Sequence, residues 1–285
     1  MEKVNRTLEN TANRFSAQYY VVNTVTIIGI FVSIVFICVH LVVHLLANNL
    51  HNLQGRNLAS FCVSLLMEYS CILLSTVVED YFCWLISGLV NYFVMSSYMW
   101  MLMMSYDTWR TIRNSIRECT LSCGDKWKRF YVYAGCSWLI PFLYLVLLDC
   151  IIPKFNMDYR IELNEMGCPV SEPLLTLLKK YTLLLILLSN SFFFGSSLYY
   201  IYINIHFTRT LNIDDNNFVN HFSLHMRLIL ITGLTWTAEE LAFYSSLDVL
   251  SLTFQTINMF EGLFIALAFT CRKQVLNSIK FLKCV

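Results

Sequence analysis

Seven long hydrophobic runs, separated by short polar joins, dominate the chain. Each run holds about 20 residues or more, which is the length that an α-helix needs to cross the hydrocarbon core of a bilayer. Backbone groups inside lipid must find partners within their own segment, so runs of this length predict helices. The predicted spans are residues 19–47, 57–79, 82–107, 130–152, 176–204, 226–247 and 252–271.

The short joins predict that consecutive helices lie antiparallel in one bundle. The expected fold is therefore an all-α membrane protein, a seven-transmembrane helix bundle over residues 19–271. Residues 1–18 are polar and lack the apolar core of a cleavable signal peptide, so we expect a short tail followed by an uncleaved anchor. Residues 272–285 place their apolar positions on one helical face, which predicts a short amphipathic helix on the inner membrane surface.

Composition supports a membrane protein and argues against several other classes. The chain is 57% hydrophobic and only 14% charged, whereas about a quarter of the residues are charged in soluble domains. A net charge of +1 gives no basic footprint for nucleic acid. No nucleophile elbow, phosphate-binding glycine loop or metal-ligand set occurs, so we expect neither an enzyme nor a cofactor. His40 and His44 share a helical face, but without further ligands they indicate a packed pair rather than a metal site.

The distribution of Lys and Arg predicts how the bundle is oriented. One set of loops carries 13 of these residues and the other carries 7. Because positive loops stay in the cytosol, the N-terminus is expected outside and the C-terminus inside, although the first helix alone argues weakly the other way. A glycosylation sequon beginning at Asn5 agrees with an extracellular N-terminus.

Two cysteines lie on the predicted outer side, where the environment is oxidising. Cys83 opens the third predicted span, and Cys168 lies in the longest outer loop. We expect a disulfide between them that ties the loop to the bundle. Cys150 is an alternative partner, and two unpaired thiols are the other alternative.

Two adjacent glutamates, Glu239 and Glu240, interrupt the sixth predicted span. A charged side chain near the bilayer centre costs roughly 2.5–3.5 kcal/mol on insertion scales, so both should face the bundle interior. Trp236 and Phe243 project between them on the helical wheel. Their depth, in the outer half of the bundle, suits a ligand or gating contact. An interhelical hydrogen bond that only fixes packing is the alternative.

Other polar residues in the predicted spans suggest partners for these acids and a second internal group. Lys179 and Lys180 enter the fifth span from the outer side and can reach inward along their stems. Separate polar residues in other spans are candidates for a network that rearranges on activation, with static hydrogen bonds as the alternative. The members of this network are Glu68, Asn91, Asn190, Asn258 and Glu261.

Five sequence strings together resemble one receptor family. The sixth span reads GLTW from Gly233, followed by Glu239, and the seventh reads NMFEG from Asn258. The third ends in SYDTW, the fourth contains WLIP, and the first inner loop is NNLHNLQGRNL. In this combination and order they resemble the Methuselah-like receptors, a branch of the secretin/adhesion-type (class B) seven-helix receptors. The resemblance covers about residues 20–280.

This chain departs from the family pattern in two places. Glu261 stands where the family carries a glutamine, which bears on packing in the seventh helix. The family usually has a large cysteine-rich ectodomain, whereas 18 residues precede the first predicted helix. Ligand capture by such a domain is therefore not carried over to this chain.

The resemblance implies a G-protein-coupled receptor of the plasma membrane, with an extracellular ligand and a heterotrimeric G protein as partners. It also implies that cations of the inner loops face the G protein. Without the resemblance, the plain interpretation of these cations is that they anchor the loops to lipid headgroups. These cations are Arg56, Arg110, Arg113, Arg117, Lys128 and Arg129. The alternatives are an odorant-gated cation channel of inverted topology and a truncated receptor remnant that does not signal.

Overall fold

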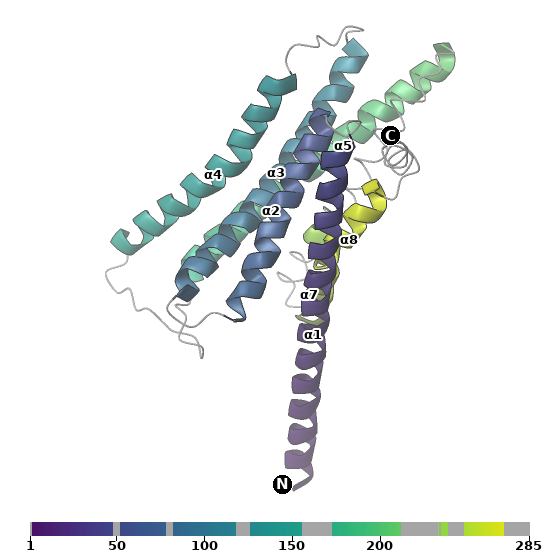
Figure 1. Cartoon of the computed structure of the whole chain (residues 1–285). Helices are drawn as coiled ribbons and strands as arrows, with labels where there is room; N and C mark the ends of the chain where they lie inside the picture. Colours follow the sequence, from purple (N-terminus) through teal and green to yellow (C-terminus); the bar gives the residue numbers. More distant parts are fainter. Residues whose placement is uncertain are drawn as a thin grey trace.

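The computed structural model is built of helices (Figure 1). It describes residues 2–47, 52–77, 82–117, 126–155, 173–211, 233, 235–238 and 248–270. Its five long helices are α1 (Glu2–Leu46), α2 (Leu53–Ser75), α3 (Cys83–Arg117), α4 (Lys126–Phe155) and α5 (Pro173–Leu211). Three short elements follow, namely α7 (Asp248–Asn258), α8 (Glu261–Ile265) and the π-helix η4 (Ala266–Thr270).

Five helices are long and apolar enough to cross a membrane by length and composition. Their spans are Thr24–Leu46, Leu53–Ser75, Leu85–Arg113, Trp127–Leu148 and Leu177–Ile203. A sixth span is available if Leu252–Asn258 and Glu261–Thr270, which meet at 46°, count as one bent crossing. The predicted sixth span, 226–247, is described only at Gly233 and at Thr235–Ala238, and the predicted amphipathic tail lies outside the described residues.

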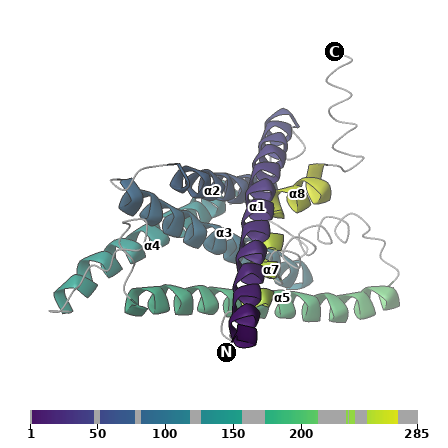
Figure 2. The same ribbon diagram turned by 90° about the horizontal axis from the view of Figure 1, so that it is seen from below.

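Helix α1 continues through the polar residues that the sequence assigned to a tail. It begins at Glu2 and runs without a break to Leu46. In Figures 1 and 2 it crosses the other helices at one side of the bundle, beside α7 and α8. Its packing partners are α2, α7, α8 and η4. The first predicted span and the polar segment before it therefore form one continuous helix.

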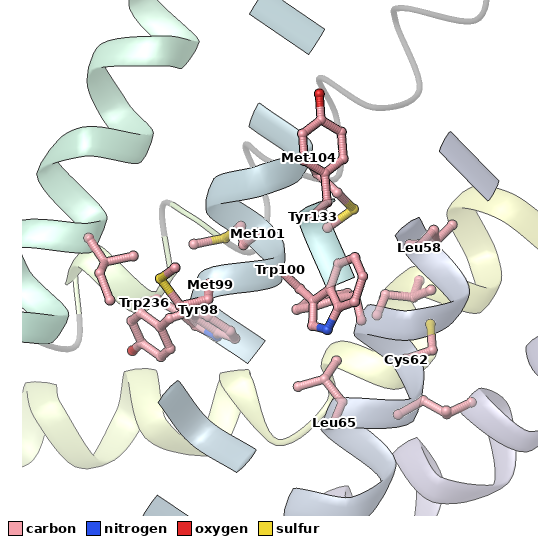
Figure 3. Close-up of a cluster of buried hydrophobic side chains, with 14 of the residues drawn as sticks. Leu58, Cys62, Leu65, Tyr98, Met99, Trp100, Met101, Met104, Tyr133 and Trp236 are labelled. Atoms are coloured by element: carbon pink, nitrogen blue, oxygen red, sulfur yellow. The ribbon is translucent and has the colours of Figure 1, made fainter. Parts of the chain in front are cut away.

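Helix α3 is the central element, because it packs against α2, α4 and α5. Its Trp100 and Met101 are fully buried, as are Phe61 and Leu65 of α2. The close-up in Figure 3 shows Trp100 of α3 turned toward Leu65 and Cys62 of α2. Interdigitation of this kind, rather than a hydrophobic drive between helices, holds a bundle together in lipid.

The outer faces of the helices are apolar as well. Large hydrophobic side chains are exposed along α1, α4 and α5, including Phe31, Leu143 and Phe192. Several hydroxyl groups on α5 return to their own helix backbone, as when Ser189 donates to the Leu185 carbonyl at 2.9 Å. A helix that is apolar all round and keeps its polar groups internally satisfied is suited to a lipid environment.

Candidate functional site

The described cations of the predicted inner loops lie at one end of the bundle, here named the basic end. They are Arg56 in the first turn of α2, Arg110 and Arg113 near the end of α3, and Lys128 and Arg129 at the start of α4. Arg117 closes α3 at the same end. At the opposite end, Lys179 and Lys180 lie half-buried near the start of α5.

Trp236 connects the sixth segment to the centre of the bundle. Its side chain is 4% exposed and stacks on Tyr98 of α3, with ring centroids 4.1 Å apart and an interplanar angle of 26°. Phe61 of α2 lies 6.3 Å away, at a tilt of 50°. Figure 3 shows the Trp236 and Tyr98 rings overlapping. Movement of the sixth segment would therefore act directly on α3.

The sixth segment also comes close to α5. A Cβ atom added at Gly233 would lie 3.3 Å from Nδ2 of Asn190. The side-chain oxygen of that asparagine accepts a short hydrogen bond from the Ser105 hydroxyl of α3. Because Gly233 has no side chain, the sixth segment can pack directly on this buried polar pair.

The helix of the seventh crossing breaks between Asn258 and Glu261. Residues of α1 and α2 form hydrogen bonds with the backbone groups that the break leaves without helical partners. The Tyr69 hydroxyl donates to the Asn258 carbonyl at 3.0 Å. The Ser33 hydroxyl donates to the Met259 carbonyl at 2.5 Å and accepts from the Gly262 amide at 3.2 Å. A helix break in a membrane persists only where neighbouring groups satisfy the freed backbone, and Ser33 and Tyr69 do so here.

Gly262 permits the closest approach between α1 and α8. A Cβ atom at this position would lie 2.5 Å from the Ser33 carbonyl oxygen and 2.8 Å from both Ser33 Cα and Ile37 Cγ1. Two of these three atoms belong to the backbone of α1, which cannot rotate away. Only glycine therefore fits between the two helices at this crossing.

Two intramembrane acids lie close to α2 or on it. Glu261, directly after the break, is 3% exposed and lies near enough to the Cys62 thiol to act on it electrostatically. Glu68 accepts a hydrogen bond from Ser97 of α3 at 3.1 Å. By contrast, the Asn91 side chain donates to the Ser87 carbonyl of its own helix at 2.8 Å.

A further buried carboxylate, Asp107, lies near the basic end. It is 2% exposed and accepts a hydrogen bond from the Tyr133 hydroxyl of α4 at 3.0 Å. Arg110 and Arg129 act on it electrostatically. The sequence drew attention to Asp107 only as part of the SYDTW string. An acid inside a predicted span is the signal that could have identified it.

His40, from the histidine pair noted in the sequence, packs against η4. His40 is buried, and its Nδ1 atom lies 3.0 Å from the Thr270 hydroxyl. The Phe269 ring meets the imidazole edge-on at 6.3 Å. Within the described part of the chain, no group of three metal-ligating side chains occurs.

Several predicted site residues lie outside what the structure describes. Glu239, Glu240, Phe243 and Cys168 are outside the described residues. For Asn5, Cys83 and Arg117 only the helical backbone is described. The gating contact, the disulfide and the glycosylation site consequently stay predictions.

Comparison with known proteins identifies the class. Residues 19–265 match the family model of seven-transmembrane receptors of the secretin family. The chain is 23% identical over 266 residues to the G-protein coupled receptor Mth2 of Drosophila simulans, covering 85% of this chain and 48% of that protein. It is likewise 23% identical over 272 residues to the probable G-protein coupled receptor Mth-like 10 of Drosophila melanogaster, covering 85% and 46%.

The chain belongs to the secretin family of seven-transmembrane receptors. The resemblance to Methuselah-like receptors drawn from the sequence strings is confirmed, because curated relatives carry that name. The family match also favours a receptor over the odorant-gated channel. The chain spans about half the length of the curated relatives it matches.

Proposed function

We propose that the chain is a G-protein-coupled receptor of the plasma membrane, with its N-terminus outside and the basic end in the cytosol. The observation that carries this proposal is the secretin-family match over residues 19–265. The excess of Lys and Arg in the loops of the basic end supports the orientation. Glycosylation at Asn5 and a Cys83–Cys168 disulfide belong to the same topology.

The ligand or gating site lies in the outer half of the bundle, around the sixth segment. It comprises Glu239, Glu240, Trp236, Phe243, Lys179 and Lys180. The stacking of Trp236 on Tyr98 supports a route from this site into α3. An extracellular ligand that binds one arrangement of the bundle better than another shifts the population toward it.

The signal leaves the receptor at the basic end. Arg56, Arg110, Arg113, Arg117, Lys128 and Arg129 face a heterotrimeric G protein there. The break in the seventh crossing supports such a transition, because the backbone groups freed there depend on hydrogen bonds to Ser33 of α1 and Tyr69 of α2. Glu68, Asn91, Asn190, Asn258 and Glu261 form the internal polar groups whose pairing changes between states.

Heterotrimer dissociation measured by energy transfer in cells tests this function. We expect basal dissociation above that of cells without the receptor, because an unliganded two-state bundle populates its active state to some extent. Glu239→Gln and Glu240→Gln should each shift this basal level at matched surface expression. Surface-expressed chain that is silent with every G-protein class would indicate a remnant that does not signal.

Mapping of Asn5 tests the orientation separately. Treatment with an N-glycosidase should lower the apparent mass of the wild-type chain and leave Asn5→Gln unchanged. An unmodified Asn5 located in the cytosol would contradict the receptor topology.

A further inference from the structure

Arg56 lies in an unusual setting at the basic end. Its guanidinium carbon sits 3.6 Å above the centroid of the Trp127 ring and 5.6 Å from that of Phe130. This stacking holds one planar face of the cation between α2 and α4. The N–H donors of a guanidinium lie in its plane, so stacking does not satisfy them.

Two of these donors lack a partner within the described part of the chain. Nε and Nη1 of Arg56 are shielded, and no described hydrogen bond reaches either atom. A shielded donor left unpaired costs about 1–3 kcal/mol, so an acceptor at this position would be favoured. On α4, Arg129 has Asp107 as an electrostatic partner, although its Nε atom likewise has no described hydrogen bond. An anion beside Arg56 would therefore supply the missing hydrogen-bond acceptors.

The depth of this cation matches the headgroup layer. The candidate span of α2 begins at Leu53 and that of α4 begins at Trp127, so Arg56 lies within one turn of the membrane boundary. Trp127 is 58% exposed and Tyr131 is 65% exposed. Their rings stack at 6.2 Å. Exposed Trp and Tyr side chains are enriched at this level of a bilayer.

An open apolar strip continues from this point along α4. Tyr131, Gly135 and Leu139 follow Trp127 at intervals of four residues. Tyr131 and Leu139 are exposed, and a Cβ atom added at Gly135 would meet nothing within 4 Å. The glycine thus leaves a notch on the surface of α4 between the exposed side chains of Tyr131 and Leu139.

We propose that Arg56, Trp127 and the notch at Gly135 form a binding site for one acidic phospholipid. The phosphate of the headgroup accepts hydrogen bonds from the Arg56 guanidinium, for which oxyanions are the preferred bidentate partners. The acyl chain lies along Gly135 on α4. Continuity of the cation with an apolar notch distinguishes a lipid from free phosphate, which does not need the notch.

The site is tested by measuring which lipids stay bound to the full-length receptor. The purified protein is equilibrated with phosphatidylcholine and phosphatidylserine in equal amounts, and the retained lipids are counted by native mass spectrometry. We expect the wild-type protein to retain phosphatidylserine in preference. Arg56→Gln should lower this preference about fivefold, the effect of one cation near an anionic surface. Arg56→Lys should have an intermediate effect, because lysine keeps the charge without the planar stack.

Arg113→Gln is the matched control. Arg113 also carries a cation–π contact at the basic end, 5.1 Å above the Trp109 ring, and its loss changes the net charge equally. Gly135→Leu fills the notch and should reduce lipid retention while the cation remains. Helicity by circular dichroism confirms that each variant is folded.

Three results would overturn the proposal. Equal losses in Arg56→Gln and Arg113→Gln would indicate a general charge effect. Displacement of the lipid by millimolar inorganic phosphate, with Gly135→Leu behaving as wild type, would indicate a free-phosphate site. Unchanged lipid retention in Arg56→Gln would contradict the lipid site, whatever the effect of this variant on G-protein activation. The lipid readout does not depend on signalling, so its failure is distinguishable from failure of the proposed function.

Discussion

Replacement of Gly262 by alanine tests the crossing of α1 and α8 with a single methyl group. The added Cβ atom would lie 2.5 Å from the Ser33 carbonyl oxygen, whereas ordinary contact begins at 3.4 Å. The two helices would have to separate by the difference, about 0.9 Å. Such a shift would also lengthen the hydrogen bond from the Gly262 amide to the Ser33 hydroxyl.

The expected cost follows from two opposing effects. Overpacking against a rigid backbone destabilises a protein by about 1–3 kcal/mol. Alanine in place of glycine within a helix returns roughly 0.5–1 kcal/mol. The net loss should therefore be about 1–2 kcal/mol, which corresponds to a fall of about 2–3 °C in the apparent melting temperature for a chain of this length.

Gly135→Ala provides the matched comparison, because the added methyl group would meet open space on α4. Only the helix-propensity gain applies there, so this variant should melt at or slightly above the wild-type temperature. The assay is thermal unfolding of both variants in the same lipid nanodisc. A Gly262→Ala protein that is as stable as Gly135→Ala would refute the close packing of α1 on α8.

Three further predictions concern the contacts within the bundle. Ser33→Ala should destabilise the receptor by about 0.6–1.7 kcal/mol, the range for hydrogen bonds in membranes. Ser189→Ala should be neutral, because that hydroxyl donates to its own helix. Equal melting temperatures of the two variants would contradict the role of Ser33. Trp236→Ala should lower the free energy of unfolding by about 3–5 kcal/mol, because a buried aromatic side chain is lost. The readout is a lower yield of folded protein in detergent. A variant as stable as wild type would contradict the stacking of Trp236 on Tyr98. Tyr133→Phe and Asp107→Asn should have non-additive effects in a double-mutant cycle of thermal stability, because the two side chains share a hydrogen bond. The expected coupling energy is about 0.5–3 kcal/mol. Purely additive effects would mean that this hydrogen bond contributes nothing to stability.

The hydrophobic pattern was sufficient to predict the five long helices. In lipid, an apolar run of membrane-spanning length can satisfy its backbone hydrogen bonds only as a helix. The sequence alone therefore determines which residues form those helices. The boundaries were harder to predict. Helix α1 begins at Glu2 and α5 extends to Leu211, because a helix propagates beyond its apolar core at little cost per residue once it has formed.

The contacts within the site could not be read from the sequence. The NMFEG string lies in an apolar run that looks continuous, and the break after Asn258 is held by Ser33 and Tyr69 from distant helices. The Asp107–Tyr133 pair likewise joins two helices across 26 positions. Tertiary partners of this kind depend on how the helices rotate and pack, which periodicity does not specify.

Nucleotide exchange on purified heterotrimers tests the central claim most directly. The chain is reconstituted in nanodiscs, and GTP-analogue uptake is measured for each class of Gα against empty discs. A receptor predicts faster uptake with at least one class, and a decrease when Arg110 and Arg113 are both changed to glutamine. Uptake equal to that of empty discs with every class, from chain that shows a cooperative thermal transition, would contradict the receptor function.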